Sequence, residues 1–417
     1  MPPIKMVGWM NFFLKNNFVL IKNNQYLCFM KETFFIPTYE QCREICDAND
    51  NFNFFESKTT IDGFPISVFS YRLCPTDLFS NPVPLNPVLK AFEMRGLTFV
   101  FNIDGTLYKR YLLMHKFFNL NQCEETAYSL MKEETIKEIT YKEDGSIVSF
   151  IRLPNGKVLG KSKASFESYQ ATEIQKIYNQ SSNLQKLVNW CIDNNLIAIF
   201  EYVSPKNRIV LRYDKTDLVI IKLRDNLTGK YISINDLPAS VVDGNTLVKT
   251  FDNLSLDDLI AKCEVDKDYE GYVVTFESGK MIKLKLLDYI ALHNLHTEDL
   301  HREDAIISLI IEEKIDDILA QLEEGDERRV MILDLIDLVN HHIMRECHEV
   351  KALYEKFDGS RKDFALIYRK DRHFASVMRI MNQNMEIVDI VKAKVLHDTF
   401  YLMNARKWIE EKKLLAK

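Results

Sequence analysis

The chain has 417 residues, of which 47% are hydrophobic and 27% are charged, so it can bury a large core and is expected to form two or three domains. Its net charge of -6 argues against a uniformly basic surface for binding nucleic acid, although a nucleotide site needs only a local cluster of cations. Eight cysteines without paired C-x-x-C spacing favour free thiols in a reducing cytoplasm over a disulfide framework.

The chain is expected to divide into three parts. We predict an N-terminal extension over residues 1–45, an α+β catalytic domain over residues 46–295 and an all-helical domain over residues 296–417. The N-terminus lacks the pattern of a signal peptide, and no apolar run reaches the roughly 20 residues that span a bilayer. The sequence therefore predicts a protein without a membrane partner.

Short β-branched and aromatic runs separated by turn signals fill the catalytic region, whereas helix-period apolar spacing begins at about residue 298. The predicted strands include residues 147–151, 198–203, 218–221, 271–276 and 281–286. Pro154-Asn155-Gly156 is typical of a turn between two of these strands. Residues 155–162 look superficially like a phosphate-binding P-loop, but they lack its first glycine and are flanked by strands on both sides.

The strongest chemical signal is the K-x-D-G motif Lys142-Glu143-Asp144-Gly145. Such a short motif is weak alone, but here it stands in an ordered series of charged motifs. A lysine nucleophile must lose its proton, and nearby cations favour the neutral amine. Asp144 is expected on the same side of the chain as Lys142, where it could hold the ammonium or a metal-bound water.

Two pairs of lysines are spaced two residues apart. Alternation in Met281–Leu286 places Lys283 and Lys285 on one face of a strand and the apolar residues on the other, and Lys161 and Lys163 have the same spacing. Neighbouring ammonium groups repel unless an anion lies near them, and a bound phosphate is the expected anion. For either pair alone, a solvated sheet face remains an equal alternative.

Together these residues resemble a known family. The motifs that carry the resemblance are Glu93-Met94-Arg95-Gly96, Lys116-Phe117-Phe118-Asn119-Leu120-Asn121, the K-x-D-G motif, Lys161-Ser162-Lys163, Phe200-Glu201-Tyr202-Val203, Asn207-Arg208-Ile209-Val210-Leu211, Glu270-Gly271-Tyr272-Val273 and Lys283-Leu284-Lys285. From about residue 52 to 293 the chain resembles the tailed-phage ATP-dependent RNA ligases that repair cleaved tRNA anticodon loops. The resemblance implies a nucleotidyltransferase (ATP-grasp-like ligase) domain of antiparallel sheets with flanking helices.

The resemblance also implies roles for the cations. Lys142 would attack the α-phosphorus of ATP and form a lysyl-AMP intermediate, from which AMP passes to the RNA 5′-phosphate before the 3′-hydroxyl seals the break. Arg95 and Lys116 would hold the β- and γ-phosphates. The α-phosphate would be bound by Lys163, Lys283 and Lys285.

The remaining roles concern the ribose, the nucleotide and the metal. Glu201 would contact the ribose, while Tyr141 and Tyr289 would belong to the nucleotide site. Glu270 would act on Mg²⁺, with Mn²⁺ as a substitute, and Asp316-Asp317 would be a further metal candidate. Residues 219–224 lack the aromatic residue that stacks on the base in many relatives, so an aliphatic contact with adenine is expected.

The C-terminal region reverses its charge along the chain. Residues 298–337 hold fourteen acidic and four basic side chains, whereas residues 361–417 hold thirteen basic and seven acidic ones. The basic stretch would suit tRNA phosphates, with an ordinary solvated helix surface as the equal alternative. His341-His342 with Cys347-His348 suggests zinc only weakly, because helical spacing would splay the ligands.

The resulting hypothesis is a monomeric, cytoplasmic RNA ligase, or one in the host cytoplasm if the source is viral. The alternatives are a DNA ligase, an mRNA capping-type nucleotidyltransferase and a noncatalytic RNA-binding relative. A binding module would have no reason to keep the nucleophile together with the phosphate-binding cations. A helical tail in place of a strand-rich module after Lys285 favours RNA ligase over the other two enzymes.

Overall fold

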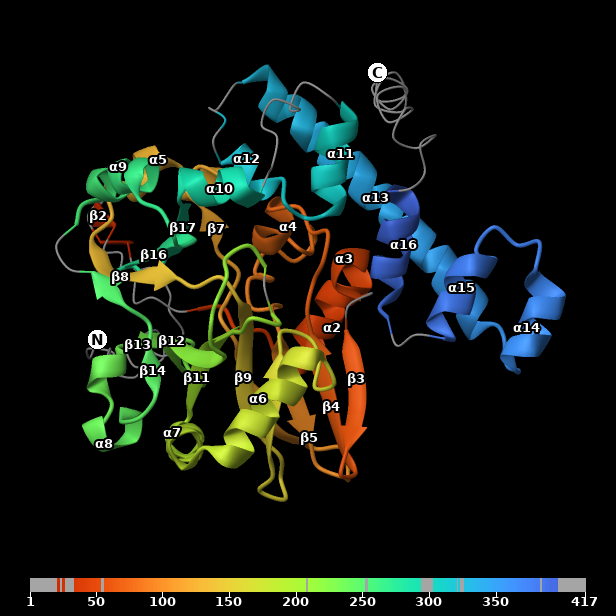
Figure 1. Cartoon of the computed structure of the whole chain (residues 1–417), viewed down its shortest axis with the longest axis horizontal. Coiled ribbons are helices and arrows are strands. Elements are labelled where there is room, and N and C mark those ends of the chain that lie inside the picture. The colour runs from red at the N-terminus through yellow and green to blue at the C-terminus, as the bar shows by residue number, and fades with distance from the viewer. Residues whose placement is uncertain are drawn as a thin grey trace, which may run out of the picture.

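The protein is described by a computed structural model covering residues 34–396 except 54–55, 208, 252–253, 294–302, 321, 323–325 and 383–384, together with the short hairpin of β1 (Ile21–Lys22) and β2 (Gln25–Tyr26). Three mainly antiparallel sheets are followed by a helical region, as Figure 1 shows. This confirms the expected α+β class with antiparallel sheets and helices. Most of the expected N-terminal extension and the expected boundary near residue 295 lie outside the described residues.

The first sheet contains four strands in the order of the chain. They are β3 (Ser57–Ile61), β4 (Phe64–Phe69), β5 (Leu97–Phe101) and β6 (Leu107–Tyr111). One face packs on α2 (Tyr39–Ala48), α3 (Asp50–Asn53) and α4 (Asp77–Ser80). Thr38 caps α2 in a capping box with Gln41, and Cys42 and Ile45 are buried, so the expected boundary near residue 45 falls inside a packed helix.

The second sheet has the order β10-β9-β11-β12-β13, with β14 parallel to β12. Its strands are β9 (Ser146–Arg152), β10 (Val158–Ser162), β11 (Leu196–Val203), β12 (Asp217–Asp225), β13 (Tyr231–Ile232) and β14 (Thr246–Leu247). Its outer face packs on α6 (Tyr169–Gln180), α7 (Ser182–Asp193) and α8 (Ala239–Val242). Residues 155–162 form the β9–β10 turn and β10 itself, which confirms that they are not a P-loop.

The third sheet has the order β15-β8-β16-β17-β7. Its strands are β7 (Phe118–Asn119), β8 (Ile136–Lys142), β15 (Thr250–Phe251), β16 (Gly271–Phe276) and β17 (Met281–Lys285). Close to it lie α5 (Tyr128–Met131), α9 (Leu256–Val265), α10 (Leu287–His293) and a 3-10 turn at Glu124–Thr126. A second 3-10 turn, at Ile234–Asp236, packs against the core of the second sheet. The predicted alternation in β17 is confirmed, because Ile282 and Leu284 are buried while Lys283 and Lys285 lie on the other face.

The three sheets share a core. Val100 of the first sheet, Ile199 of the second and Val273 of the third belong to one buried cluster. The second and third sheets are also joined by Lys222, whose Nζ donates to the Glu138 carboxylate and, at 3.1 Å, to the Thr275 hydroxyl. This packing brings the ends of β8, β11 and β17 around one space.

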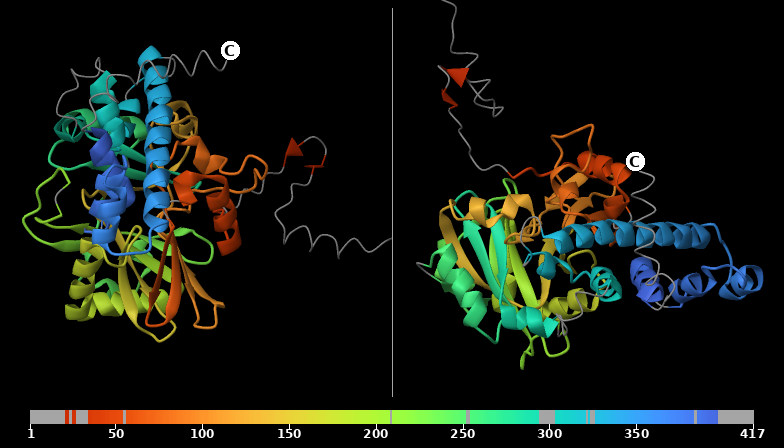
Figure 2. Two further views of the ribbon diagram at one scale, coloured as in Figure 1. Left: turned by 90° about the vertical axis from the view of Figure 1, so that its right-hand side faces the viewer. Right: turned by 90° about the horizontal axis from the view of Figure 1, so that it is seen from above.

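The helical region follows the sheets and projects from one side of them, as the two views of Figure 2 show. Its helices are α11 (Glu303–Ile311), α12 (Asp316–Leu319), α13 (Glu327–Glu355), α14 (Arg361–Tyr368), α15 (Phe374–Ile380) and α16 (Ile387–Leu396). Leu73, from the loop after β4, is buried in its core. Arg72 beside it donates to Asp389 at 2.8 Å and to Glu313 at 2.9 Å, so the first sheet and the helices are joined by both apolar and ionic contacts.

Seven cysteines lie within the described residues, and none of these seven forms a disulfide, which agrees with the predicted free thiols. Cys28 lies outside the described part of the chain. No described helix is long and apolar enough to cross a membrane.

Candidate active site

Lys142 ends β8 and contacts a buried carboxylate. Gly271, the first residue of β16, pairs with Lys142 on one side and with Lys285 on the other, so Glu270 lies just before β16 between the two lysines. Its Oε2 is 2.5 Å from Lys142 Nζ, and its Oε1 is 3.3 Å from Lys285 Nζ. Glu270 therefore bridges the K-x-D-G lysine and the second lysine of β17, and sheet register fixes that bridge.

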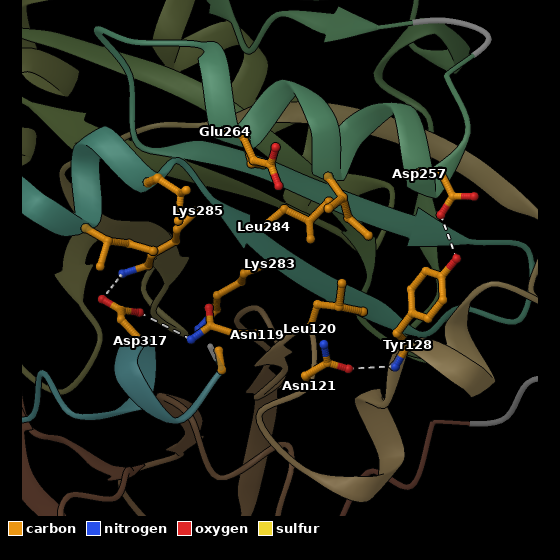
Figure 3. A pocket seen from close by; sticks show the side chains of 15 residues that line it. Asn119, Leu120, Asn121, Tyr128, Asp257, Glu264, Lys283, Leu284, Lys285 and Asp317 are labelled. Atoms are coloured by element: carbon orange, nitrogen blue, oxygen red, sulfur yellow. Dashed lines mark hydrogen bonds and ion pairs between the residues drawn. The ribbon is translucent and has the colours of Figure 1, made fainter. Parts of the chain in front are cut away.

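A second carboxylate reaches this group from the helical region. Lys285 Nζ donates to Asp317 Oδ2 at 3.0 Å, and the Asn119 side chain donates to Asp317 Oδ1 at 3.3 Å, as Figure 3 shows. These residues line a pocket of about 470 Å³ between β7, β17, α9, α10 and α12. Burial lowers the pKa of Lys285, but Glu270 and Asp317 outweigh it, so that pKa is raised overall.

Four further cations lie near one another and near Lys142, without carboxylate partners. Of the residues that the structure describes, none places a carboxylate within ion-pair distance of Arg95, Lys116, Lys163 or Lys283. Aromatic rings contact them instead. Lys116 Nζ lies 4.9 Å from the centre of the Phe118 ring, Lys163 Nζ 5.0 Å from that of Tyr71, and Lys283 Nζ 5.0 Å and Arg95 Cζ 6.0 Å from that of Phe117.

The charge states of these cations reflect burial and mutual repulsion. Burial, followed by the charges of Lys116 and Arg95, lowers the pKa of Lys283 well below its ordinary value. Burial also lowers the pKa of Lys163 to about 8. Burial acts to lower the pKa of Lys116 too, but Tyr71 and Asp316 raise it by more. A cluster of this kind has a strong electrostatic preference for an anion.

Glu201 lies on β11 across from the K-x-D-G turn. Burial, reinforced by the charge of Glu270 and opposed by those of Lys142 and Arg95, raises the pKa of Glu201 to about 8. A side chain at Gly145 would place its Cβ 2.5 Å from the Tyr202 carbonyl oxygen and 3.0 Å from Glu201 Cγ. The glycine of the motif therefore lets the turn after Lys142 approach β11 closely.

Asp144 and Tyr289 hold the motif in place. Asp144 Oδ2 accepts from the backbone N–H groups of Val210 and Leu211, at 2.9 and 2.6 Å, and its Oδ1 accepts from the Tyr289 hydroxyl at 2.9 Å. The expectation that Asp144 holds the Lys142 ammonium was wrong, because its oxygens face these donors and Glu270 holds Lys142. The structure places Tyr289 against the motif carboxylate at the start of α10.

Tyr141 lies on the face of β8 opposite to Lys142. Its ring packs against those of Tyr269 and Phe251, with centroids 4.5 and 4.6 Å away. Lys249 Nζ lies 5.7 Å from the centre of the Tyr141 ring. Alternation along β8 points Tyr141 and Lys142 to opposite faces, so the tyrosine side chain belongs to an aromatic cluster.

The two predicted metal candidates Asp316 and Asp317 diverge. Asp317 is buried and bonded to Lys285, whereas Asp316 lines a different cleft, between α4 and α13. They do not form a shared carboxylate pair. Carboxylate oxygens suit Mg²⁺, and Glu270 and Asp317 are the buried carboxylates beside the lysines, so by donor type the Glu270 position fits a divalent cation.

Arg224 helps to organise the site but carried no clear sequence signal, and Lys161 has a role other than the predicted one. The Arg224 guanidinium on β12 is fully buried and donates to Glu93 Oε2 at 2.7 Å, which anchors the segment before Arg95. Lys161 Nζ donates to the carbonyl oxygens of Gly96 and Lys163. The expectation that Lys161 and Lys163 present a paired cationic face was wrong, because β10 ends at Ser162 and Lys161 turns into the protein.

The suggested zinc ligands do not converge. Cys347 is buried in the helical core, while His348 Nε2 lies 3.0 Å from Asp50. Among the described residues, one other group has suitable donor atoms close together: Glu346, Glu349 and His373. Arg372 already donates to both glutamates of this group, and Lys394 to Glu346 at 3.1 Å, so it is an ion-pair network that joins α13, α15 and α16.

The proteins that this chain resembles are RNA ligases, which agrees with the cation-rich geometry of the site. Residues 93–289 match the family model described as RNA ligase. A curated relative from Thermovibrio ammonificans, named "Putative RNA ligase", is 23% identical over 296 residues, which is 69% of this chain and 74% of the relative. The matched family segment holds Lys142, Lys285 and the four cations that have no carboxylate partner.

Solved structures show more distant likenesses. An archaeal ATP-dependent RNA ligase (form 2) is 11% identical with a TM-score of 0.42, over 72% of this chain and 76% of that one. A Naegleria gruberi RNA ligase with PPi is 16% identical with a TM-score of 0.36, over 43% of this chain and 58% of that one. The family model alone shows that the segment carrying the site, residues 93–289, is similar to the RNA ligase family.

Proposed function

We propose that this protein is an ATP-dependent RNA ligase that joins 5′-phosphate and 3′-hydroxyl RNA ends, with cleaved tRNA as its substrate class. The observation that carries the proposal is the arrangement around Lys142, in which one carboxylate, Glu270, bridges the lysine to Lys285 while four cations without carboxylate partners face the same space. The family match over residues 93–289 supports it. Phosphoryl transfer sites consist mainly of cations arranged around developing negative charge.

In the first step Lys142 Nζ, as the free amine, attacks the α-phosphorus of ATP. A nitrogen–phosphorus bond forms, the bond from the α-phosphorus to the bridging oxygen of the β-phosphate breaks, and pyrophosphate leaves. Arg95 and Lys116 neutralise the charge that builds on the leaving group. Glu270 holds the Lys142 side chain, and its carboxylate is the group suited to accept the proton that the ammonium must lose before attack.

A divalent cation fits next to Glu270, where it would neutralise phosphate charge. Lys163, Lys283 and Lys285 bind the α-phosphate, and Glu201 binds the ribose hydroxyls. A Glu201 pKa of about 8 keeps much of this carboxyl protonated near neutral pH, so it can donate as well as accept hydrogen bonds. Val219 and Ile221 supply an aliphatic surface near Tyr213 for the adenine.

The later steps rely on Lys142 and the cations assigned to the α-phosphate. The RNA 5′-phosphate attacks the phosphorus of lysyl-AMP, which releases Lys142 and forms an RNA-adenylate. The 3′-hydroxyl of the second end then attacks the 5′-phosphorus, and AMP leaves. These two steps involve no triphosphate, so the cations assigned to pyrophosphate matter less for them.

A single ligation assay tests the function. The full chain with Mg²⁺ is given a nicked anticodon stem-loop with 5′-phosphate and 3′-hydroxyl ends, and separately a DNA strand of the same sequence. ATP should support sealing of the RNA, whereas GTP and NAD should not. Preferential sealing of DNA would identify a DNA ligase, transfer of GMP to an RNA 5′-diphosphate would identify a capping enzyme, and binding without any transfer would identify a noncatalytic relative.

A further inference from the structure

Lys161 is a lysine that the proposed chemistry does not use. It lies on β10 with 1% of its surface exposed. Its Nζ donates to the carbonyl oxygen of Gly96 at 3.1 Å and to that of Lys163 at 3.4 Å. Of the residues that the structure describes, none offers it a carboxylate.

A buried ammonium without a carboxylate is unusual, because burial of an unpaired charge is costly. The other deeply buried lysine of the sheets, Lys222, shows the ordinary solution: it is 3% exposed and forms an ion pair with Glu138. Burial alone lowers the pKa of Lys161 to about 7.

The two acceptors of Lys161 lie on the two chain segments that carry phosphate-binding cations. Gly96 directly follows Arg95, and the second acceptor belongs to Lys163 itself. The segments are in direct contact, because a Cβ at Gly96 would lie 2.4 Å from the Lys163 carbonyl oxygen and 3.3 Å from Lys161 Nζ. Gly96 has a φ of 82°, a left-handed conformation that suits glycine.

The Gly96 carbonyl oxygen also accepts from the Thr98 hydroxyl at 3.0 Å, whereas Lys161 is the one donor to the Lys163 carbonyl oxygen among the described residues. The Lys161 amine nitrogen donates to both oxygens, so it ties the backbone of Gly96 to that of Lys163. On the other side of Arg95, the Arg224–Glu93 ion pair holds the same segment. The Arg95 segment is thus clamped at two points, one residue after Arg95 and two residues before it.

We propose that Lys161 is a positioning residue for the polyphosphate of the nucleotide: it ties the Arg95 segment to Lys163 and so sets the spacing of the cations that bind the phosphates. The inference rests on the proposed adenylyl transfer for its kinetic consequences.

The variant Lys161→Met removes the donor and keeps the length of the side chain. We expect KM for ATP in the adenylation step to rise at least about 10-fold, while sealing of pre-adenylated RNA changes by less than about 2-fold. A role in general stability would lower both activities together. An unchanged KM for ATP in the folded variant would overturn the proposal, as would equal losses in the two assays.

Two further variants complete the test. Gly96→Ala disturbs the same contact from the opposite strand segment and should also raise KM for ATP. Lys222→Met removes a matched buried lysine outside the site, so it should lower thermal stability and leave KM for ATP within about 2-fold. If Lys161→Met does not fold, Gly96→Ala decides: a normal KM for ATP in that variant would contradict the proposed spacing role.

Binding of inorganic tripolyphosphate by calorimetry separates this inference from the proposed function. The unaltered chain should bind it, and Lys161→Met should bind it at least about 10-fold more weakly. A chain that transfers no AMP but shows this difference would refute the ligase function and retain the positioning role. Equal binding by both proteins would refute the positioning role alone.

Discussion

Two groups of cations share the site, and they are stabilised in different ways. Lys142 and Lys285, the paired lysines, are held by the buried carboxylates of Glu270 and Asp317. The unpaired cations contact aromatic rings or backbone; they are Arg95, Lys116, Lys163 and Lys283. The paired lysines are fixed by the protein itself, whereas the unpaired cations form a positive cluster that a polyphosphate would complete.

This difference suggests a division of labour. A carboxylate next to the nucleophile orients it and can take its proton, so Glu270 serves the bond-forming atom. Carboxylates in direct contact with the pyrophosphate cations would compete with the substrate, and the described residues place none within ion-pair distance of Arg95 or Lys116. Burial first, and then the neighbouring cations, lower the pKa values of Lys163 and Lys283.

The largest expected effect comes from removing an unpaired cation that serves only the leaving group. Lys116→Met should slow formation of the covalent AMP adduct by about 10²–10³-fold, because charge on the departing pyrophosphate loses a buried cation. Sealing of pre-adenylated RNA, which releases no pyrophosphate, should fall by less than about 10-fold. Pre-steady-state measurement of both steps checks this, and equal losses would remove the functional distinction between the two groups.

The next largest effect is a difference in protein stability between a paired lysine and an unpaired cation on the same strand, β17. Lys285→Met leaves Glu270 and Asp317 without a shared partner and should cost about 3–5 kcal/mol in the free energy of unfolding. Lys283→Met, two residues earlier, removes a buried charge that its cationic neighbours repel, so stability should stay equal or increase. Urea unfolding of both variants measures the contrast, and a large loss in Lys283→Met would show that the lysine has a partner in solution.

The affinity for ATP should depend on pH through the unpaired group. In the free protein the Lys163 pKa is about 8, so this ammonium is charged below pH 8 and becomes neutral above it. Phosphate favours the charged form, and Kd for ATP should therefore rise by up to about 10-fold per pH unit above pH 8. Calorimetry on Lys142→Met avoids covalent turnover, and Lys163→Arg, which keeps its charge, should flatten the profile.

The smallest effect concerns cations far from the sheets. Arg369 and Lys370 are exposed just after α14, at the distal end of the helical region in Figure 1. If they contact RNA phosphates, replacing both with Ala should reduce the slope of log affinity against log salt by about 2. Arg372 is engaged by Glu346 and Glu349, so its replacement should instead lower the thermal stability of the helices. An unchanged salt slope would exclude RNA contacts by Arg369 and Lys370.

Sequence reasoning was most reliable where one strand carried the whole signal. Alternation in β17 predicted that Lys283 and Lys285 share a face, and the strands around Glu201 and Glu270 were predicted within a few residues. It failed where the partner came from elsewhere in the chain. The carboxylate next to Lys142 is Glu270, 128 residues away, and the carboxylate of the motif itself binds backbone groups near residue 210 and Tyr289.

The same reason explains the other gaps. Lys161 and Lys163 have the spacing of a strand face, but β10 ends between them, and spacing alone does not show where a strand ends. Asp316 and Asp317 are adjacent in sequence, yet a helix directs neighbouring side chains about 100° apart, so they face different clefts. Arg224 lies near the end of β12, and its partner Glu93 is 131 residues away in the sequence, so the pair could not be predicted from the strand alone.

The proposed ligase function depends most directly on the covalent chemistry of Lys142. The full chain should be incubated with ATP and Mg²⁺ without RNA, digested, and its peptides mapped by mass spectrometry. We expect one AMP adduct, on Lys142, that is absent from Lys142→Met and is removed when pyrophosphate is added back. An adduct on another lysine, or its persistence in Lys142→Met, would contradict the assignment of the nucleophile and with it the roles given to the surrounding cations.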